Sequence, residues 1–144
     1  MGGRRHAREI AMQALYQYAL NPVPVEELLL YKWIDEKPEG EIKEFADELI
    51  RGTIENIDTI DRFIREKSQN WDIERITKVD RAILRFSIYS LMNIPKIPKK
   101  VVINEAIEIA KRYGTEKSFQ FVNGVLDGIT IETRKNKGRK DPNA

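Results

Sequence analysis

The sequence predicts an all-α protein that folds as a single domain. Apolar residues recur at helical spacing along most of the chain, and no stretch alternates apolar and polar residues as a half-buried strand would. A length of 144 residues is a usual size for one domain. We expect this all-helical domain to cover residues 1–134, and the polar, basic residues 135–144 to form a disordered tail.

The strongest helical signal lies in residues 77–93. Its apolar residues cover much of the helix circumference, which is typical of a helix surrounded by other helices. Thr77 followed by Asp80 resembles a capping box at its start, and Pro95 disfavours helix at the residue before it. We therefore expect a central core helix over 77–93, preceded by a short turn at 72–75.

Three helices are expected before this central helix, over residues 4–20, 25–35 and 41–67. Alanines on the inward face of the first helix would allow a neighbouring helix to approach closely, and Pro22 follows its end. The third helix carries Gly52 in its middle, where glycine costs about 1 kcal/mol relative to alanine. Close packing against another helix is the compensation that we expect there.

Two helices are expected after the central helix, over residues 101–113 and 116–132. The loop 94–100 between the central helix and the first of these contains two prolines. Gly114 stands where a helix C-terminus favours a residue with positive φ. Thr115 can cap the helix that follows.

Composition excludes several classes of activity. The chain has no cysteine, so disulfides, cysteine zinc sites and a thiol nucleophile are excluded, and its one histidine, His6, leaves no pair for a metal site. We find no glycine-rich phosphate loop and no nucleophile elbow, so we expect a protein that is not an enzyme and needs no metal or cofactor. No apolar run approaches the roughly 20 residues of a membrane span, and no signal peptide pattern begins the chain, so we expect a cytoplasmic protein.

Positive charge is unevenly distributed, although the net charge is only +2. Acidic residues lie mainly between positions 26 and 74. This separation indicates an anionic partner that meets a basic surface, and ordinary solvated charge is the alternative. Basic residues gather in three places: Arg4, Arg5 and Arg8; Lys96, Lys99 and Lys100; and Arg134, Lys135, Lys137, Arg139 and Lys140.

The N-terminal arginines Arg4, Arg5 and Arg8 are the first candidate binding site. Arginines near a helix start oppose the helix dipole, which suggests another use for them. Guanidinium groups bind phosphate through two hydrogen bonds, and Tyr16 on the same helix face could stack on a base. We predict RNA or DNA binding here; the alternative is a solvated pair between Arg5 and Glu9.

The start of the last helix is the second candidate. Helix N-termini favour anions, and Lys117, Ser118 and Phe121 together would make an edge that binds nucleotides. The alternative for Phe121 is a place at the flank of the core.

Carboxylates near the start of the central helix are the third candidate. Glu74 and Asp80 could pair with a basic protein partner, or Asp80 could only cap its own helix. Other carboxylates at i,i+3, such as Glu105 and Glu108, are interpreted as solvated helix faces.

Three segments of the sequence resemble the NusB family of bacterial transcription antitermination factors: RRHAREIAMQALYQ, ITKVDRAILRFSIYSL and VVINEAIEIAKRYGTEKSFQFVNGVLD. The resemblance implies a fold of two three-helix bundles packed perpendicular to each other. It also implies binding to the boxA element of ribosomal RNA leader transcripts, as a heterodimer with the ribosomal protein NusE. Such a complex makes RNA polymerase read through terminators. A homodimer of the free protein is a further possibility.

The resemblance carries over to individual residues. Arg4, Arg5 and Arg8 match the arginine-rich start of the family, and His6 stands where relatives can have another arginine. Tyr16 matches the tyrosine in the family's ALY motif. These matches imply contacts with RNA at the first candidate site.

In the second and third candidate sites, Phe121 matches the aromatic residue of FVNG and Ser118 precedes it on the same edge that faces RNA. Lys117 stands where relatives have an acid, which implies stronger and less selective RNA binding. Asp80 occupies the position of a carboxylate that faces NusE, and Glu74 lies near it.

Two alternative functions remain open at this point. One is a domain that targets RNA, like that at the N-terminus of some ribosomal RNA methyltransferases. The other is a helical adaptor between proteins that does not contact RNA, for which changing Arg5 and Arg8 to alanine would leave all binding intact.

Overall fold

The structure is a computed structural model that describes residues 2–69 and 72–129. Within these ranges all regular structure is helical, which confirms the all-α prediction. No helix in the described part of the chain is long and apolar enough to cross a membrane. The domain boundary at residue 134 and the tail at 135–144 lie outside the described residues and stay predictions.

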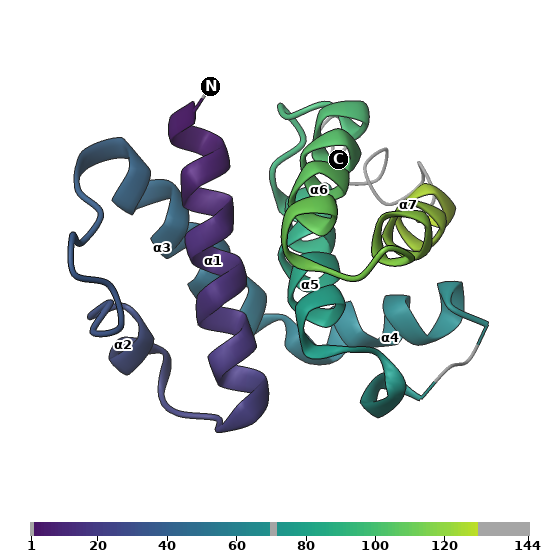
Figure 1. Ribbon diagram of the computed structural model, residues 1–144, viewed down its shortest axis with the longest axis horizontal. Helices are drawn as coiled ribbons and strands as arrows, with labels where there is room; N and C mark the ends of the chain where they lie inside the picture. Colours follow the sequence, from purple (N-terminus) through teal and green to yellow (C-terminus); the bar gives the residue numbers. More distant parts are fainter. Residues whose placement is uncertain (1, 70–71, 130–144) are drawn as a thin grey trace, which may run out of the picture.

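α5 (Lys78–Asn93) is the central helix, and α1, α3, α4, α6 and α7 all pack against it (Figure 1). Every residue from position 80 to 91 is buried, so the wide apolar arc in the sequence correctly predicted a surrounded helix. Thr77 caps α5, because its hydroxyl accepts the N–H of Asp80 at 3.2 Å. The expected turn before α5 is a 3₁₀ helix, η1 (Ile73–Arg75).

The helices form two groups on either side of the molecule (Figure 1), which agrees with the expected arrangement of two bundles. α1 packs against α3 in the first group, and α6 packs against α7 in the second. The first group contains α1 (Gly2–Leu20), α2 (Val25–Leu28) and α3 (Gly40–Glu55). The second contains α4 (Ile57–Lys67), α5, α6 (Lys99–Tyr113) and α7 (Ser118–Gly128).

The prediction of a helix over 25–35 is wrong, because α2 is a single turn. α2 ends at Leu28, and Tyr31 beyond it has a φ of 53° and a fully buried side chain. The Tyr31 hydroxyl donates to Asp47 on α3, and the Trp33 indole donates to Gln13 on α1 at 2.9 Å. The apolar residues of this stretch therefore anchor a loop to two helices.

The prediction of one long helix over 41–67 is also wrong, because Asn56 separates α3 from α4. Asn56 has φ −115° and ψ 21°, and its side-chain amide donates to the carbonyl of Gly52 at 2.8 Å. The apolar spacing continues across Asn56, so periodicity gave no sign of the break. The break allows α3 to pack on α1 while α4 packs on α5 and α7.

Gly114 follows α6 as expected, but the prediction of a positive φ is wrong, since its φ is −95°. A Cβ at this position would overlap the side chain of Ser118 and lie 2.9 Å from the carbonyl oxygen of Ala110. Close approach therefore requires glycine here. α7 begins at Ser118, later than expected, and Thr115 accepts the N–H of Lys117 at 3.3 Å in the turn before it.

Gly52 confirms the expectation of close helix packing. A Cβ on Gly52 would overlap the ring of Tyr89 on α5, which is 8% exposed. Because Gly52 has no side chain, α3 and α5 can approach each other until the backbone of α3 contacts the ring of Tyr89.

We predict that Gly52→Ala lowers the free energy of unfolding by about 1–3 kcal/mol, because the added methyl group forces the Tyr89 ring to move within a packed core. Gly124→Ala is the matched control, since no atom lies within 4 Å of a Cβ there and alanine favours helix by up to about 1 kcal/mol. Urea unfolding measures both effects. A Gly52→Ala variant as stable as Gly124→Ala would contradict this account of the contact.

Candidate nucleic-acid interface

Charged side chains from α1 and α6 meet in a group that we call the arginine–glutamate seam. Its centre is Glu105, whose two carboxylate oxygens accept hydrogen bonds from Nε and Nη2 of Arg5 at 2.8 and 3.0 Å. Nη1 of Arg8 lies 3.8 Å from the same carboxylate. The seam consists of Arg4, Arg5, Arg8, Glu9, Glu105 and Arg112.

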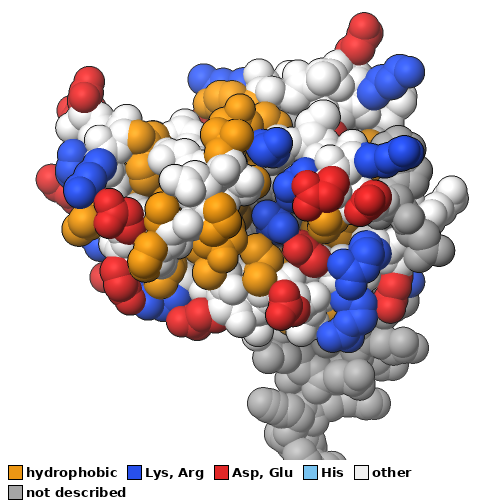
Figure 2. Space-filling view, turned by 90° about the horizontal axis from the view of Figure 1, so that it is seen from below, with side chains coloured by type: hydrophobic (Ala, Val, Ile, Leu, Met, Phe, Trp, Pro, Cys, Tyr) orange, Lys and Arg blue, Asp and Glu red, His pale blue; other side chains and the backbone are white. Residues whose placement is uncertain are grey.

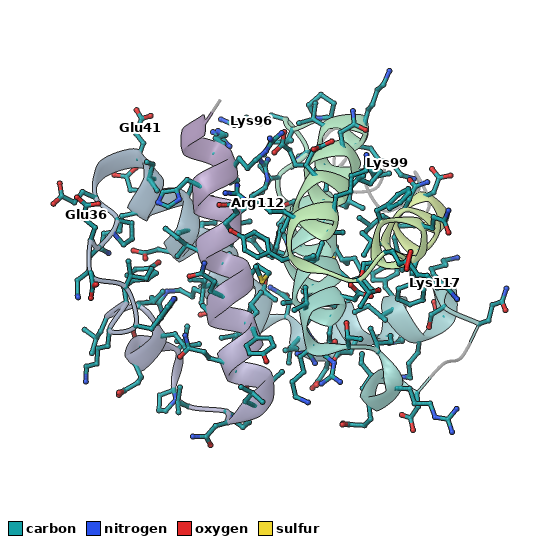
Figure 3. All side chains as sticks on the ribbon, viewed as in Figure 1. Glu36, Glu41, Lys96, Lys99, Arg112 and Lys117 are labelled. Carbon is teal, nitrogen blue, oxygen red and sulfur yellow. The ribbon has the colours of Figure 1, made fainter. Side chains whose placement is uncertain are left out.

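The second ion pair of the seam joins Arg112 of α6 to Glu9 of α1, with 2.9 Å between Nη1 and Oε2. Figure 3 shows Arg112 between these two helices. The Arg112 side chain is 65% exposed, whereas that of Glu9 is 12% exposed. The cationic partner therefore faces solvent and the anionic partner lies beneath it.

Phe45 of α3 supports the arginines from the other side. The guanidinium carbons of Arg4 and Arg8 lie 4.4 and 5.3 Å from the centre of its ring, within the range of a cation–π contact. Arg4 is exposed, but Arg8 is only 4% exposed, and this burial lowers the pKa of Arg8. Arg8 therefore presents almost no surface to a ligand.

The carboxylates of the seam neutralise only part of the positive charge of its arginines. The hydrogen bonds from Arg5 lower the pKa of Glu105, and the same pair raises the pKa of Arg5. Four guanidinium groups thus face two carboxylates, so two positive charges remain within the seam. Such a surplus on one surface favours an anionic ligand.

Tyr16 lies apart from the seam, in the C-terminal half of α1. It lies eleven positions after Arg5, which is about 16 Å along a helix. Tyr16 is 37% exposed and lines a groove of about 320 Å³ with Trp33, Val79 and Tyr113. The helix face that carries Arg5 and Tyr16 is therefore not uniformly exposed, since Arg8 and Met12, which lie between these two residues, are both buried.

The residues at the start of α7 form a separate group. Lys117 is exposed and lies on the side of α6 away from α1 (Figure 3). Ser118 is 1% exposed, and its hydroxyl accepts the N–H of Thr115 at 2.9 Å, so it builds the turn into α7. Phe121 is half-buried and lines a groove of about 370 Å³ with Gln69 and Gln120.

Asp80 and Glu74 differ in their access to a partner. Asp80 is 7% exposed, and no hydrogen bond to its Oδ1 is found within residues 2–69 and 72–129. Burial raises its pKa, and hydrogen bonding with the hydroxyls of Ser118 and Thr77 partly opposes that rise. Asp80 therefore lies where the starts of α5 and α7 meet, whereas Glu74 in η1 is exposed.

An apolar surface surrounds the end of α1. Figure 2 views the molecule from below and shows hydrophobic side chains gathered on the side that α1 and α2 occupy. A groove of about 480 Å³ lies there, lined in part by Leu20, Val23 and Trp33. Trp33 also lines the groove of Tyr16, so the two grooves adjoin.

Sequence reasoning missed the acidic half of the seam. The interpretation of Glu105 as a solvated residue is wrong, and so is the alternative pairing of Arg5 with Glu9. Arg5 pairs with a residue 100 positions away, so local spacing contains no signal for this contact. Phe45 and Arg112 were missed for the same reason.

The fold and the seam define a class: an all-α protein built round one buried helix, with a surface suited to an anionic partner. The chain belongs to the NusB family, whose family model matches residues 5–130. It is 46% identical over 143 residues to the transcription antitermination protein NusB of Geobacter sulfurreducens, covering 96% of this chain and 100% of that one. It is 43% identical over 140 residues to the protein of that name from Thermodesulfovibrio yellowstonii, covering 90% and 92%. These relatives are transcription factors, not enzymes.

Solved structures of the family share the fold. NusB of T. maritima matches with a TM-score of 0.79 and 41% identity, over 92% of this chain and 90% of that one. A crystal structure of the antitermination factors NusB and NusE in complex with dsRNA matches with a TM-score of 0.73 and 27% identity, over 94% and 98%.

The raised pKa of Asp80 predicts a pH-dependent stability. The folded state holds the Asp80 proton more tightly than the unfolded chain, whose carboxyl has the ordinary pKa of 3.8. The ionised carboxylate therefore reduces the free energy of unfolding, by an amount that is absent below pH 3.8 and grows until the pH passes the raised pKa.

Asp80→Asn is neutral at every pH. The free energy of unfolding of this variant, minus that of the original protein, should therefore rise between pH 3.8 and the raised pKa of Asp80 and stay constant at higher pH. Urea unfolding of both proteins between about pH 3 and about pH 7 measures the difference. A difference that does not change with pH would show that burial of Asp80 has no such effect.

Proposed function

We propose that this chain binds the boxA element of ribosomal RNA leader transcripts as a heterodimer with NusE, and so promotes read-through by RNA polymerase in the cytoplasm. Membership of the NusB family supports this proposal, and so does the related structure of NusB with NusE and dsRNA, as a complex of these two proteins with RNA. The observation that carries it is the seam, where arginines from α1 and α6 gather on one surface.

Phosphate contacts would supply most of the affinity. Arg4 is exposed and the Arg5 side chain is 43% exposed, so both can reach a phosphate. The buried Arg8 would act by its charge and by holding the seam together. Binding of this kind weakens as salt rises, because each phosphate contact releases counterions.

Base contacts would supply sequence preference. We assign them to Tyr16 and Phe121, the aromatic residues that line these two grooves. Rings of this kind stack on unpaired bases, so we propose single-stranded RNA as the ligand. Lys117 would add a phosphate contact, and Ser118 would hold the start of α7 in place.

NusE would meet Glu74 and the region around Asp80. Glu74 is the accessible carboxylate of the two. Val79, the neighbour of Asp80, lines the apolar groove beside Tyr16, so a partner there could bury apolar surface as well as pair its charges. Joining two weak RNA-binding surfaces in one heterodimer would raise the overall affinity.

We predict that Arg5→Ala weakens RNA binding and reduces the slope of log affinity against log salt concentration by about 1, because one phosphate contact is lost. Arg51→Ala is the matched control, since Arg51 on α3 also makes two hydrogen bonds to one glutamate, Glu26, away from the seam. Fluorescence anisotropy with labelled RNA measures both variants. Equal affinities and slopes for the two variants would remove Arg5 from the RNA site.

A further inference from the structure

We propose that Glu105 determines specificity by acting through Arg5: it holds this side chain in an internal ion pair, offsets the charge of the buried Arg8, and so limits binding of RNA that offers only phosphates. This inference rests on the proposed function, because it concerns the same RNA-binding surface. Glu105 is a positioning residue in this account, and it need not touch RNA.

The geometry at Glu105 leaves Arg5 only partly available. The carboxylate occupies Nε and one of the two terminal nitrogens of Arg5, at 2.8 and 3.0 Å. Nη1 of Arg5 is the remaining nitrogen, and the side chain is 43% exposed. A phosphate that approaches Arg5 therefore meets a guanidinium group whose charge is already paired and whose orientation is fixed.

The same carboxylate also acts on Arg8, whose Nη1 lies 3.8 Å away. The Glu105 side chain is 21% exposed, so its ion pairs are only partly screened by water. Arg5 lowers the pKa of Glu105, so the carboxylate stays ionised at neutral pH and the ion pairs persist. Glu9 accepts one hydrogen bond from Arg112, which leaves Arg4 as the arginine of the seam that is not paired with either of its two carboxylates.

Internal pairing of this kind affects two classes of RNA differently. RNA of arbitrary sequence binds through phosphates alone, so its affinity depends on how many cations are free. A preferred RNA also gains from stacking and from base contacts, which the ion pairs do not weaken. Glu105 therefore lowers the affinity for arbitrary RNA more than that for the preferred RNA.

The test is the variant Glu105→Gln, which removes the negative charge but keeps a side-chain oxygen that can accept a hydrogen bond from Arg5. The affinity of the full chain for a scrambled single-stranded RNA should rise several-fold and its salt slope should become steeper, because a carboxylate no longer offsets the charge of Arg5. The preference for a boxA-like RNA over the scrambled RNA should fall. Anisotropy titrations over a salt series measure both quantities, and urea unfolding checks that the variant is folded.

Glu108→Gln is the matched control. Glu108 lies one turn further along α6, is exposed and acts on Arg5 through its charge at a distance. We expect this variant to change the affinity for scrambled RNA much less than Glu105→Gln does. Equal effects of the two variants would show that total charge matters and that the ion pair does not.

A second control places Glu105→Gln in an Arg5→Ala background, where most of the gain should disappear because no Arg5 is left to release. A full gain in that background would overturn the inference, as would unchanged binding of scrambled RNA by Glu105→Gln alone. If the original protein itself does not prefer the boxA-like RNA, the proposed function fails first. If it does prefer that RNA and Glu105→Gln changes nothing, only the role of Glu105 fails.

Discussion

Burial of α5 on all sides is the constraint on which the rest of the structure depends. Twelve consecutive residues of α5 are buried, and they include the charged residues Arg81 and Arg85. Arg85 makes two hydrogen bonds to Asp61 of α4, at 2.9 and 2.8 Å, which compensates part of its desolvation. A helix that carries buried charge needs its neighbours in fixed positions, since an unpaired buried charge is strongly destabilising.

The seam is a consequence of this arrangement. α1 and α6 both pack against α5, so side chains from the two ends of the chain become neighbours. Arg5 then meets Glu105, and Glu9 meets Arg112, across 100 and 103 positions of sequence respectively. The surface proposed to bind RNA is therefore assembled by tertiary packing, and any change that displaces α1 from α5 would also separate the paired charges.

Sequence reasoning succeeded where local physics decides the structure. The cap by Thr77, the wide apolar arc of α5 and the close contact at Gly52 are each encoded within a few residues. It failed where tertiary contacts override a local pattern. The apolar period passes through Asn56 without a break. α2 ends at Leu28, and the buried Tyr31 beyond it donates its hydroxyl to Asp47 of α3.

The candidate site shows the same division. The arginines of α1 stood out because they oppose the helix dipole, and the resemblance to the NusB family assigned them to RNA. Neither argument could predict that Arg8 is buried against Phe45, or that Glu105 neutralises part of the charge. Both features depend on how helices distant in sequence pack together.

The central claim is that this chain recognises a particular RNA and does so better with its partner. The most direct measurement is binding of a boxA-like single-stranded RNA and of a scrambled one over a salt series, with and without NusE, with a duplex of the same sequence alongside. We predict a preference for the boxA-like single strand that strengthens when NusE is added. Equal, weak binding to all three RNAs, unchanged by NusE, would contradict the account and leave a basic helical protein without a defined RNA ligand.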